Sequence, residues 1–421
     1  MRKLLLAFKK DFWLYLFVAL LTEVSGDTVL FGGSIDRTLF NFPLYLMVAL
    51  LGIVVLKRNY KNDKLLPLIG VLICAMFLSS IINEGTIRGA TLLLSCAFVV
   101  AYLITTKISF YDFSRIFVNI ILIGTLYSII IWILAIIGLV SLNYYETVGR
   151  ASILEYGQCY FFNAPLLMRN SFVFREPGLF QIMINMAFLF EITSKDKIDI
   201  KHIFIYTVGI FSTLSTAGYI TFGALLFMYF HKGKISSYNV FLFAVLAIGI
   251  FFVFMQEDLM GFVFDKFNGE SGNTRSRSAI ISLYILFHDI KCLFFGAGVD
   301  NLDTLYASYG SQIFNYHSTI NGMLTNTFLN SAATFGIWIF VYFVAGFYLL
   351  AKILTKYRPI SDMYIVFIVF LLLFSNEAMY YSIFPHLMVF YGFNKKSFMP
   401  MMLQSSQGKC IKKDLKSSID F

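Results

Sequence analysis

Residues 116–141 read IFVNIILIGTLYSIIIWILAIIGLVS, an apolar run without a charged residue. About 20 such residues are enough for a helix to cross the hydrocarbon core of a bilayer. The whole chain has the same character, because 58% of its 421 residues are hydrophobic and only 14% are charged, whereas soluble domains carry about 25% charged residues. The sequence therefore predicts an all-α polytopic membrane protein surrounded by the lipid bilayer.

A window of span length predicts about twelve transmembrane helices. They are expected at residues 11–30, 38–56, 65–83, 86–106, 116–141, 178–193, 199–217, 218–231, 238–256, 319–351, 361–376 and 377–393. The first is interpreted as an uncleaved span, because more spans follow and no small-residue cleavage site ends it. No internal repeat divides the chain, so residues 1–421 are expected to form a single membrane domain.

Lysine and arginine alternate along the chain in a way that predicts its orientation. They precede the first span, fill every second connection and crowd the tail, residues 394–421. Basic connections face the cytoplasm, so both termini are predicted to be cytoplasmic. This bias accounts for the net charge of +9 without a nucleic-acid partner.

Two long segments, residues 142–177 and 257–318, fall on the outer side in this topology. Functional sites often lie on such loops, and these two are too rich in aromatic and aliphatic residues for disorder. Cys159 and Cys292 lie in them, and their scattered positions favour two free thiols over a disulfide. The active-site region is expected here.

The second segment contains a predicted helix, residues 274–295, at the outer membrane surface. Arg275 and Arg277 lie in its first turn, where basic residues oppose the helix dipole. An anionic ligand explains them, and contact with lipid phosphates is the alternative. Gly296 and Gly298 follow and are expected to turn the backbone back toward the membrane.

The first segment ends in SFVFREPGLFQ, residues 171–181. Pro177 suits the first position of a helix. The free N–H groups at that helix start carry partial positive charge, so Arg175 beside them would complete an anion-binding site. The alternative is a topology anchor with an exposed Arg175–Glu176 pair.

These motifs together resemble bacterial O-antigen and capsular polysaccharide polymerases of the Wzy type. The Arg175–Gly178 element, the Ser/Thr-rich residues 212–218, Arg277 followed by the Gly-x-Gly turn, and His317 at the start of a late span occur in that order. The resemblance covers about residues 175–340. It implies a glycosyltransferase that uses undecaprenyl-diphosphate-linked glycan as donor and acceptor at the periplasmic face of the bacterial inner membrane, with a chain-length regulator and a flippase as partner proteins.

Departures from the family pattern help to choose among related activities. Thr216-Ala217-Gly218 stands where O-antigen ligases carry Arg before Gly, and Cys292-Leu293 stands where proline is frequent. Both departures favour a polymerase over a ligase that transfers glycan to lipid A core. A lipid-linked oligosaccharide flippase is the other alternative, but its charges should line many spans, whereas here they gather in the two outer segments.

The resemblance also implies roles for particular residues. Arg175 and Arg277 would hold the diphosphate with their planar forks. His317 would take the proton of the acceptor hydroxyl, or position that hydroxyl or the diphosphate. The expected substrate-binding residues are Glu176, Arg275, Ser215, Thr216 and Asn321.

The alternative for Ser215 and Thr216 is helix packing, and for His317 a capping role. Among the acidic residues at span ends, Glu23, Glu84 and Glu377 are each able to face a polar cavity. No acidic cluster has metal-ligand spacing, so we expect a metal-independent mechanism without a cofactor.

Overall fold

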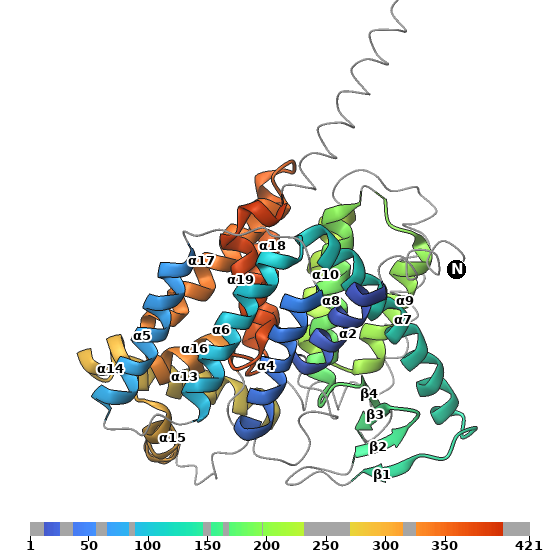
Figure 1. Cartoon of the computed structure of the whole chain (residues 1–421). Helices are drawn as coiled ribbons and strands as arrows, with labels where there is room; N and C mark the ends of the chain where they lie inside the picture. Colours follow the sequence, from blue (N-terminus) through green and yellow to red (C-terminus); the bar gives the residue numbers. More distant parts are fainter. Residues whose placement is uncertain are drawn as a thin grey trace, which may run out of the picture.

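The computed structural model describes most of the chain as packed helices (Figure 1). The ranges that it describes are residues 12–25, 37–55, 65–83, 89–145, 153–162, 168–195, 197–230, 270–314 and 326–398. Within them the chain is mostly helical, as predicted. The span expected at residues 238–256 and most of the tail lie outside the described residues.

The described helices before residue 231 follow the predicted spans closely. They are α2 (Phe12–Ser25), α4 (Arg37–Val55), α5 (Leu66–Ile82), α6 (Gly89–Lys107), α7 (Phe110–Ile136), α8 (Pro177–Ser194), α9 (Ile200–Thr213) and α10 (Thr216–Phe230). Those after residue 269 are α13 (Glu270–Leu286), α14 (Ile290–Phe295), α15 (Val299–Phe314), α16 (Thr327–Phe335), α17 (Ile337–Leu354), α18 (Ile360–Ser375) and α19 (Ile383–Phe393), with a short 3₁₀ turn at Lys395–Phe398.

Among the described residues, two helices are both long and apolar enough to cross a membrane. They are α7, with 27 residues, and α17, with 18. Shorter apolar helices there include α5, with 17 residues, and α18, with 16. The count of about twelve spans therefore stays a prediction.

Helix α8 lies at the centre of the bundle. Its residues from Pro177 to Thr193 are all buried, and α7, α9, α10 and α18 pack around it. A helix that is apolar on every side is stable only when other helices surround it. Its neighbours approach closely, since a Cβ atom at Gly209 of α9 would lie 2.4 Å from Thr125 of α7 and 3.2 Å from Ile184 of α8.

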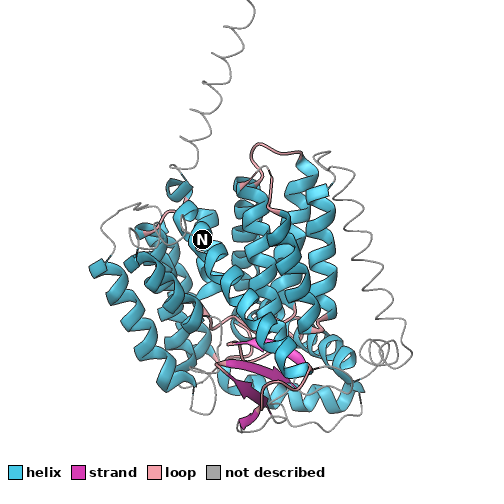
Figure 2. Ribbon diagram, turned by 90° about the vertical axis from the view of Figure 1, so that its right-hand side faces the viewer, coloured by secondary structure: helices cyan, strands magenta, loops and turns pink. Residues whose placement is uncertain are grey.

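Residues 142–177 form a small sheet, so the all-α prediction is wrong for this segment. Its antiparallel strands, in spatial order, are β1 (Asn143–Tyr145), β2 (Ile153–Tyr156), β3 (Cys159–Phe162) and β4 (Arg169–Phe172). Gly157 and Gln158 join β2 to β3 with positive φ angles of 59° and 64°, the conformation of a tight hairpin turn. The strands lie beneath the helices in Figures 1 and 2.

The helix predicted over residues 274–295 is two helices, α13 and α14. The predicted helix is interrupted at Asp289, because the Asp289 carboxylate accepts a hydrogen bond from the Cys292 N–H and caps the start of α14. Helix α13 also begins earlier than predicted, at Glu270. Helix α15 follows and lies at the same end of the bundle as the sheet (Figure 1), so the described parts of the two long segments lie at one end of the molecule.

The Gly-x-Gly turn packs its backbone against the backbone of α16. Gly296 and Gly298 have φ angles of 66° and 78°. The N–H groups of Ala297 and Gly298 donate to the carbonyls of Ala333 (2.8 Å) and Thr334 (3.0 Å) at the end of α16. A Cβ atom at Gly296 would lie 2.3 Å from the Thr334 carbonyl, so no larger residue fits.

Two late spans differ from their predicted bounds. The span expected at residues 319–351 breaks at Gly336, whose φ of 107° ends α16 and starts α17. The span expected at residues 377–393 becomes helical only at Ile383, where Ser382 caps α19. Residues 376–382 therefore connect α18 to α19 without forming a helix.

Candidate functional site at the start of helix α8

The candidate site begins where strand β4 leads into α8. Glu176 is the N-cap of α8, with extended φ and ψ of −143° and 148°, and Pro177 takes the first helical position, as predicted. The Glu176 carbonyl accepts the N–H groups of Leu179 and Phe180. Arg175 Nη2 lies 4.0 Å from Glu176 Oε1, and their side chains are 15% and 25% exposed. The Arg175–Glu176 pair is thus largely buried, which argues against an exposed topology anchor.

Glu377 touches the first turn of α8 at Gly178. A Cβ atom placed on Gly178 would lie 1.9 Å from Glu377 Oε1 and 2.9 Å from its Cδ, so only glycine allows this carboxylate to lie there. A helix start stabilises a nearby negative group by about 0.3–1 kcal/mol. The structure therefore brings a carboxylate to the helix end that the sequence predicted to bind an anion.

Helix α16 fixes the backbone of the Glu377 segment. The Thr327 hydroxyl donates to the Glu377 carbonyl (2.5 Å) and accepts the Met379 N–H (2.9 Å). Asn326 caps α16 by accepting the N–H groups of Phe328 and Leu329, both at 3.0 Å. The starts of α8 and α16 thus meet on the two sides of Glu377.

Arg277 is half-buried near the start of α13 and is connected to α16 through its neighbour Ser278. The Ser278 carbonyl accepts hydrogen bonds from the Tyr306 hydroxyl (3.0 Å) and the Ser282 hydroxyl (2.9 Å). Both hydroxyls also lie 2.8 Å from Asn330 Oδ1 on α16. Burial raises the pKa of Tyr306 to about 12, so its hydroxyl keeps its proton. These contacts hold the α13 start on α16, one turn from Thr327.

The Ser/Thr-rich element, residues 212–218, forms the turn between α9 and α10. Leu214 has left-handed φ and ψ of 47° and 42° and ends α9. Ser215 is buried and Thr216 half-buried. Helix α10 then packs on α8, since a Cβ atom at Gly218 would lie 3.1 Å from Gln181 Cβ. Ser215 and Thr216 lie two or three residues before this close helix crossing, and their predicted binding role stays a prediction.

Strand β4 attaches this turn to the sheet. Arg169 Nε donates to the Thr213 carbonyl (3.2 Å), and Asn170 Nδ2 donates to the hydroxyls of Ser128 (3.1 Å) and Ser212 (3.2 Å). The strand ends at Phe172, and the chain passes through Phe174 to Arg175. The sheet thus positions the α8 start and the α9–α10 turn together, a function that the sequence did not reveal.

Three predicted residues cannot be placed at the site. His317 and Asn321 lie outside the described residues, and so does the side chain of Arg275. Their predicted roles remain predictions. The chain is described again from Asn326, directly beside the Glu377 segment.

The site combines cationic and anionic side chains around two helix starts. Arg175 and the α8 N–H groups are suited to an anion, whereas Glu176 and Glu377 are suited to hydroxyl groups. Among the described residues, no group of three or more His, Cys, Asp and Glu side chains is placed to hold a metal ion. Cys159 and Cys292 are free thiols, as expected.

Sequence reasoning named Glu377 only as one of three glutamates at span ends, and it missed Thr327, Tyr306 and Asn330. The contact between Glu377 and Gly178 joins positions far apart in the chain, so no local pattern points to it. No protein-family model, no curated protein and no solved structure matches the chain.

Proposed function

We propose that the chain is a membrane glycosyltransferase that polymerises undecaprenyl-diphosphate-linked repeat units into O-antigen or capsular polysaccharide. The observation that carries the proposal is the contact of the Glu377 carboxylate with the first turn of α8, which begins two residues after Arg175. This arrangement puts a group for an anion and a group for a hydroxyl within one helical turn. Glycosyl transfer from a lipid diphosphate needs both.

Arg175 is assigned to the diphosphate leaving group. Its guanidinium stays protonated and pairs two oxygens at once, and its small exposure strengthens that interaction by excluding water. The start of α8 adds a second source of positive potential, which acts on the Glu377 carboxylate as well. Together they stabilise the charge that develops as the glycosidic bond to the diphosphate breaks.

Glu377 is assigned to the acceptor sugar. A carboxylate held by the α8 start and, through Thr327, by α16 is positioned to accept a hydrogen bond from the attacking hydroxyl. His317 is proposed to take the hydroxyl proton or to hold the diphosphate, as the family resemblance implies. Arg277 is assigned to the diphosphate as well, because α13 is fixed on α16 next to this centre.

The proposed membrane topology agrees with this site. The sheet and α15 lie at one end of the helices (Figure 1), and β4 leads into the start of α8 there. From the alternation of basic connections we assign that end to the periplasm. Reporter fusions at Gly157 and Gly272 should therefore behave as periplasmic. Cytoplasmic reporter activity at either position would contradict the assignment, because lipid-linked substrate would then be on the opposite side.

The glycan made by a strain that lacks the gene tests the proposed activity. A polymerase defect leaves lipid A core carrying one repeat unit, or a capsule fraction without long chains. Bare core without any repeat unit would indicate the O-antigen ligase instead. A strain that accumulates repeat units on the cytoplasmic face would indicate a flippase.

A further inference from the structure

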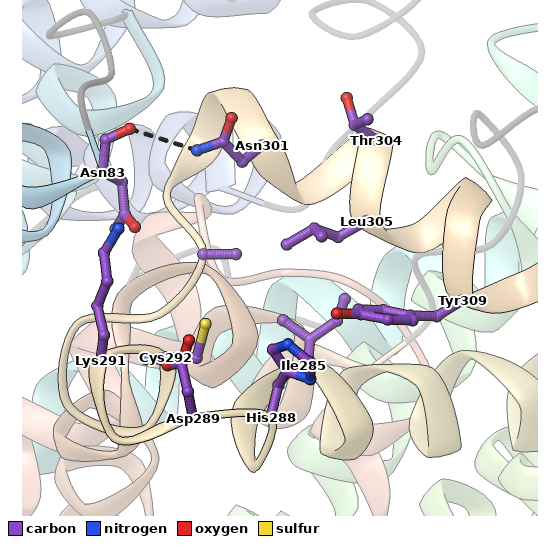
Figure 3. Close-up of a pocket in the computed structure, with 11 residues that line it drawn as sticks. Asn83, Ile285, His288, Asp289, Lys291, Cys292, Asn301, Thr304, Leu305 and Tyr309 are labelled. Atoms are coloured by element: carbon purple, nitrogen blue, oxygen red, sulfur yellow. Dashed lines mark hydrogen bonds between the residues drawn. The ribbon is translucent and has the colours of Figure 1, made fainter.

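A pocket of about 270 Å³ lies between α13, α14, α15 and the end of α5 (Figure 3). It is separate from Glu377 and opens beside the junction of α13 and α14. The lining residues that the argument uses first are Ile285, His288, Cys292, Ala297, Asn301 and Tyr309. The volume is slightly below the range of pockets that hold drug-sized ligands, about 300–1,000 Å³, so it suits one small ligand or one unit of a chain.

The pocket has an apolar floor and a polar rim. Ile285, Cys292 and Ala297 are buried in the floor, whereas His288 and Asn301 are exposed at the rim. Figure 3 shows the Tyr309 hydroxyl and the His288 ring directed toward the space between α15 and the α13–α14 junction. Such a lining buries one apolar face of a ligand and offers hydrogen bonds around its edge.

The Tyr309 ring is held in place by its neighbours. Its centroid lies 4.8 Å from that of Tyr284, edge to face, and 5.6 Å from that of His288. Within the described residues, the Tyr309 hydroxyl makes no hydrogen bond, although the ring is 9% exposed. A hydroxyl without a protein partner is available to a ligand.

The charges of the rim cancel. Lys291 is cationic, and Asp289 is anionic because the Cys292 backbone N–H donates to its carboxylate and lowers its pKa. Moving phosphate or another anion from water into the pocket therefore gains little electrostatic free energy. The same holds for a cation. An apolar ligand would remove water from the polar rim groups without replacing their hydrogen bonds, at about 1–3 kcal/mol for each buried group.

We propose that this pocket binds one neutral sugar unit of the glycan chain. A sugar ring presents an apolar C–H face to the floor and hydroxyl groups to the Tyr309 hydroxyl, the His288 ring and the Asn301 amide. The inference rests on the proposed function for the identity of the chain, but its physical basis is independent of the α8 site.

Helix α16 connects the pocket to the proposed reaction centre. The floor residue Ala297 donates its N–H to Ala333 (2.8 Å), whereas Thr327, at the other end of α16, holds Glu377. Ala333 lies six residues after Thr327, a rise of about 9 Å at 1.5 Å per residue. A short oligosaccharide bridges such a distance, so the pocket is placed to hold a sugar near the unit that reacts.

The test is sugar binding to the purified full chain in lipid nanodiscs. Saturation-transfer NMR with free hexoses, N-acetylhexosamines and 6-deoxyhexoses should detect at least one sugar. Tyr309→Phe keeps the ring and removes one neutral hydrogen bond, so we expect affinity to fall roughly 3- to 10-fold. His288→Ala, at an exposed position, should also weaken binding. Tyr284→Phe is the matched control, because Tyr284 is outside the lining, and it should bind as the wild type does.

Several results would overturn the inference. They are no sugar binding by the wild type, binding unchanged in both Tyr309→Phe and His288→Ala, or displacement of the sugar by inorganic phosphate. Glycosyl transfer measured on the same protein separates the two proposals. If the protein transfers glycan but binds no sugar at the pocket, the sugar-binding proposal alone is refuted. If sugar binding depends on Tyr309 but the protein has no transfer activity, the proposed function alone is refuted.

Discussion

Replacing Gly178 by alanine adds one methyl group to the candidate site and leaves every charge in place. The new Cβ would lie 1.9 Å from Glu377 Oε1, and real Cβ contacts stay above 3.0 Å. Because the carboxylate is the end of a flexible side chain, it is the group that moves. The substitution therefore shifts the Glu377 carboxylate by at least about 1.1 Å.

A displacement of about 1 Å in a group that orients substrate costs on the order of 100-fold in rate, or about 2.7 kcal/mol of activation free energy. Stability should change little. Alanine favours a helix over glycine by about 0.5–1 kcal/mol, and the carboxylate loses about 0.3–1 kcal/mol of interaction with the helix start. These two contributions to the free energy of unfolding have opposite signs and similar size.

The assay is polymer formation by the purified variant, supplied with lipid-linked repeat units extracted from the deletion strain. Gly223→Ala is the matched control, because Gly223 is also in a helix and a Cβ atom there would meet nothing within 4 Å. Gly178→Ala with a rate within about threefold of the wild type would refute the reasoning that the Glu377 position matters to the reaction.

Three further predictions concern single side chains. The rate of transfer should fall about 10- to 100-fold in Arg175→Lys and in Arg277→Lys at normal protein levels. Lysine lacks the planar guanidinium group and loses roughly 1.5–3 kcal/mol of charged hydrogen bonding. Unchanged polymer in both variants would assign the two arginines to lipid contact. His317→Ala should abolish polymer, measured by glycan ladders, while membrane fractionation shows normal insertion. Normal ladders would show that His317 has no part in the mechanism. Burial, with a smaller effect of Glu155, raises the pKa of Cys159 to about 12, above the ordinary value of about 8.5. At pH 8 the folded thiol is therefore protonated and should resist maleimide until the protein is denatured, so rapid labelling of Cys159 in the folded protein would contradict its placement in the sheet.

Hydropathy and proline position predicted much of the fold because both are local properties. The spans expected at residues 65–83 and 86–106 correspond to α5 and α6 within three residues at each end, and Pro177 correctly marked the start of α8. The sheet was missed because the Gly157–Gln158 turn lacks the usual Asn-Gly or Asp-Gly signature. The break at Gly336 was missed because the apolar run continues through it.

The candidate site was predictable only in part. The Arg175–Gly178 motif indicated a helix start suited to an anion, and the structure places its charged pair there. The group that touches this start, Glu377, comes from a distant segment whose path depends on the hydrogen bonds of Thr327. Such a contact is set by tertiary packing and has no periodic or local signal in the sequence.

The most direct test of the central claim is the reaction of the purified protein with lipid-linked repeat units alone, in the presence of a metal chelator. The proposed polymerase should lengthen the glycan by whole repeat units and release one undecaprenyl diphosphate for each bond formed, with the chelator present. Repeat units that remain unextended, or that are extended only when lipid A core is added as acceptor, would contradict the account.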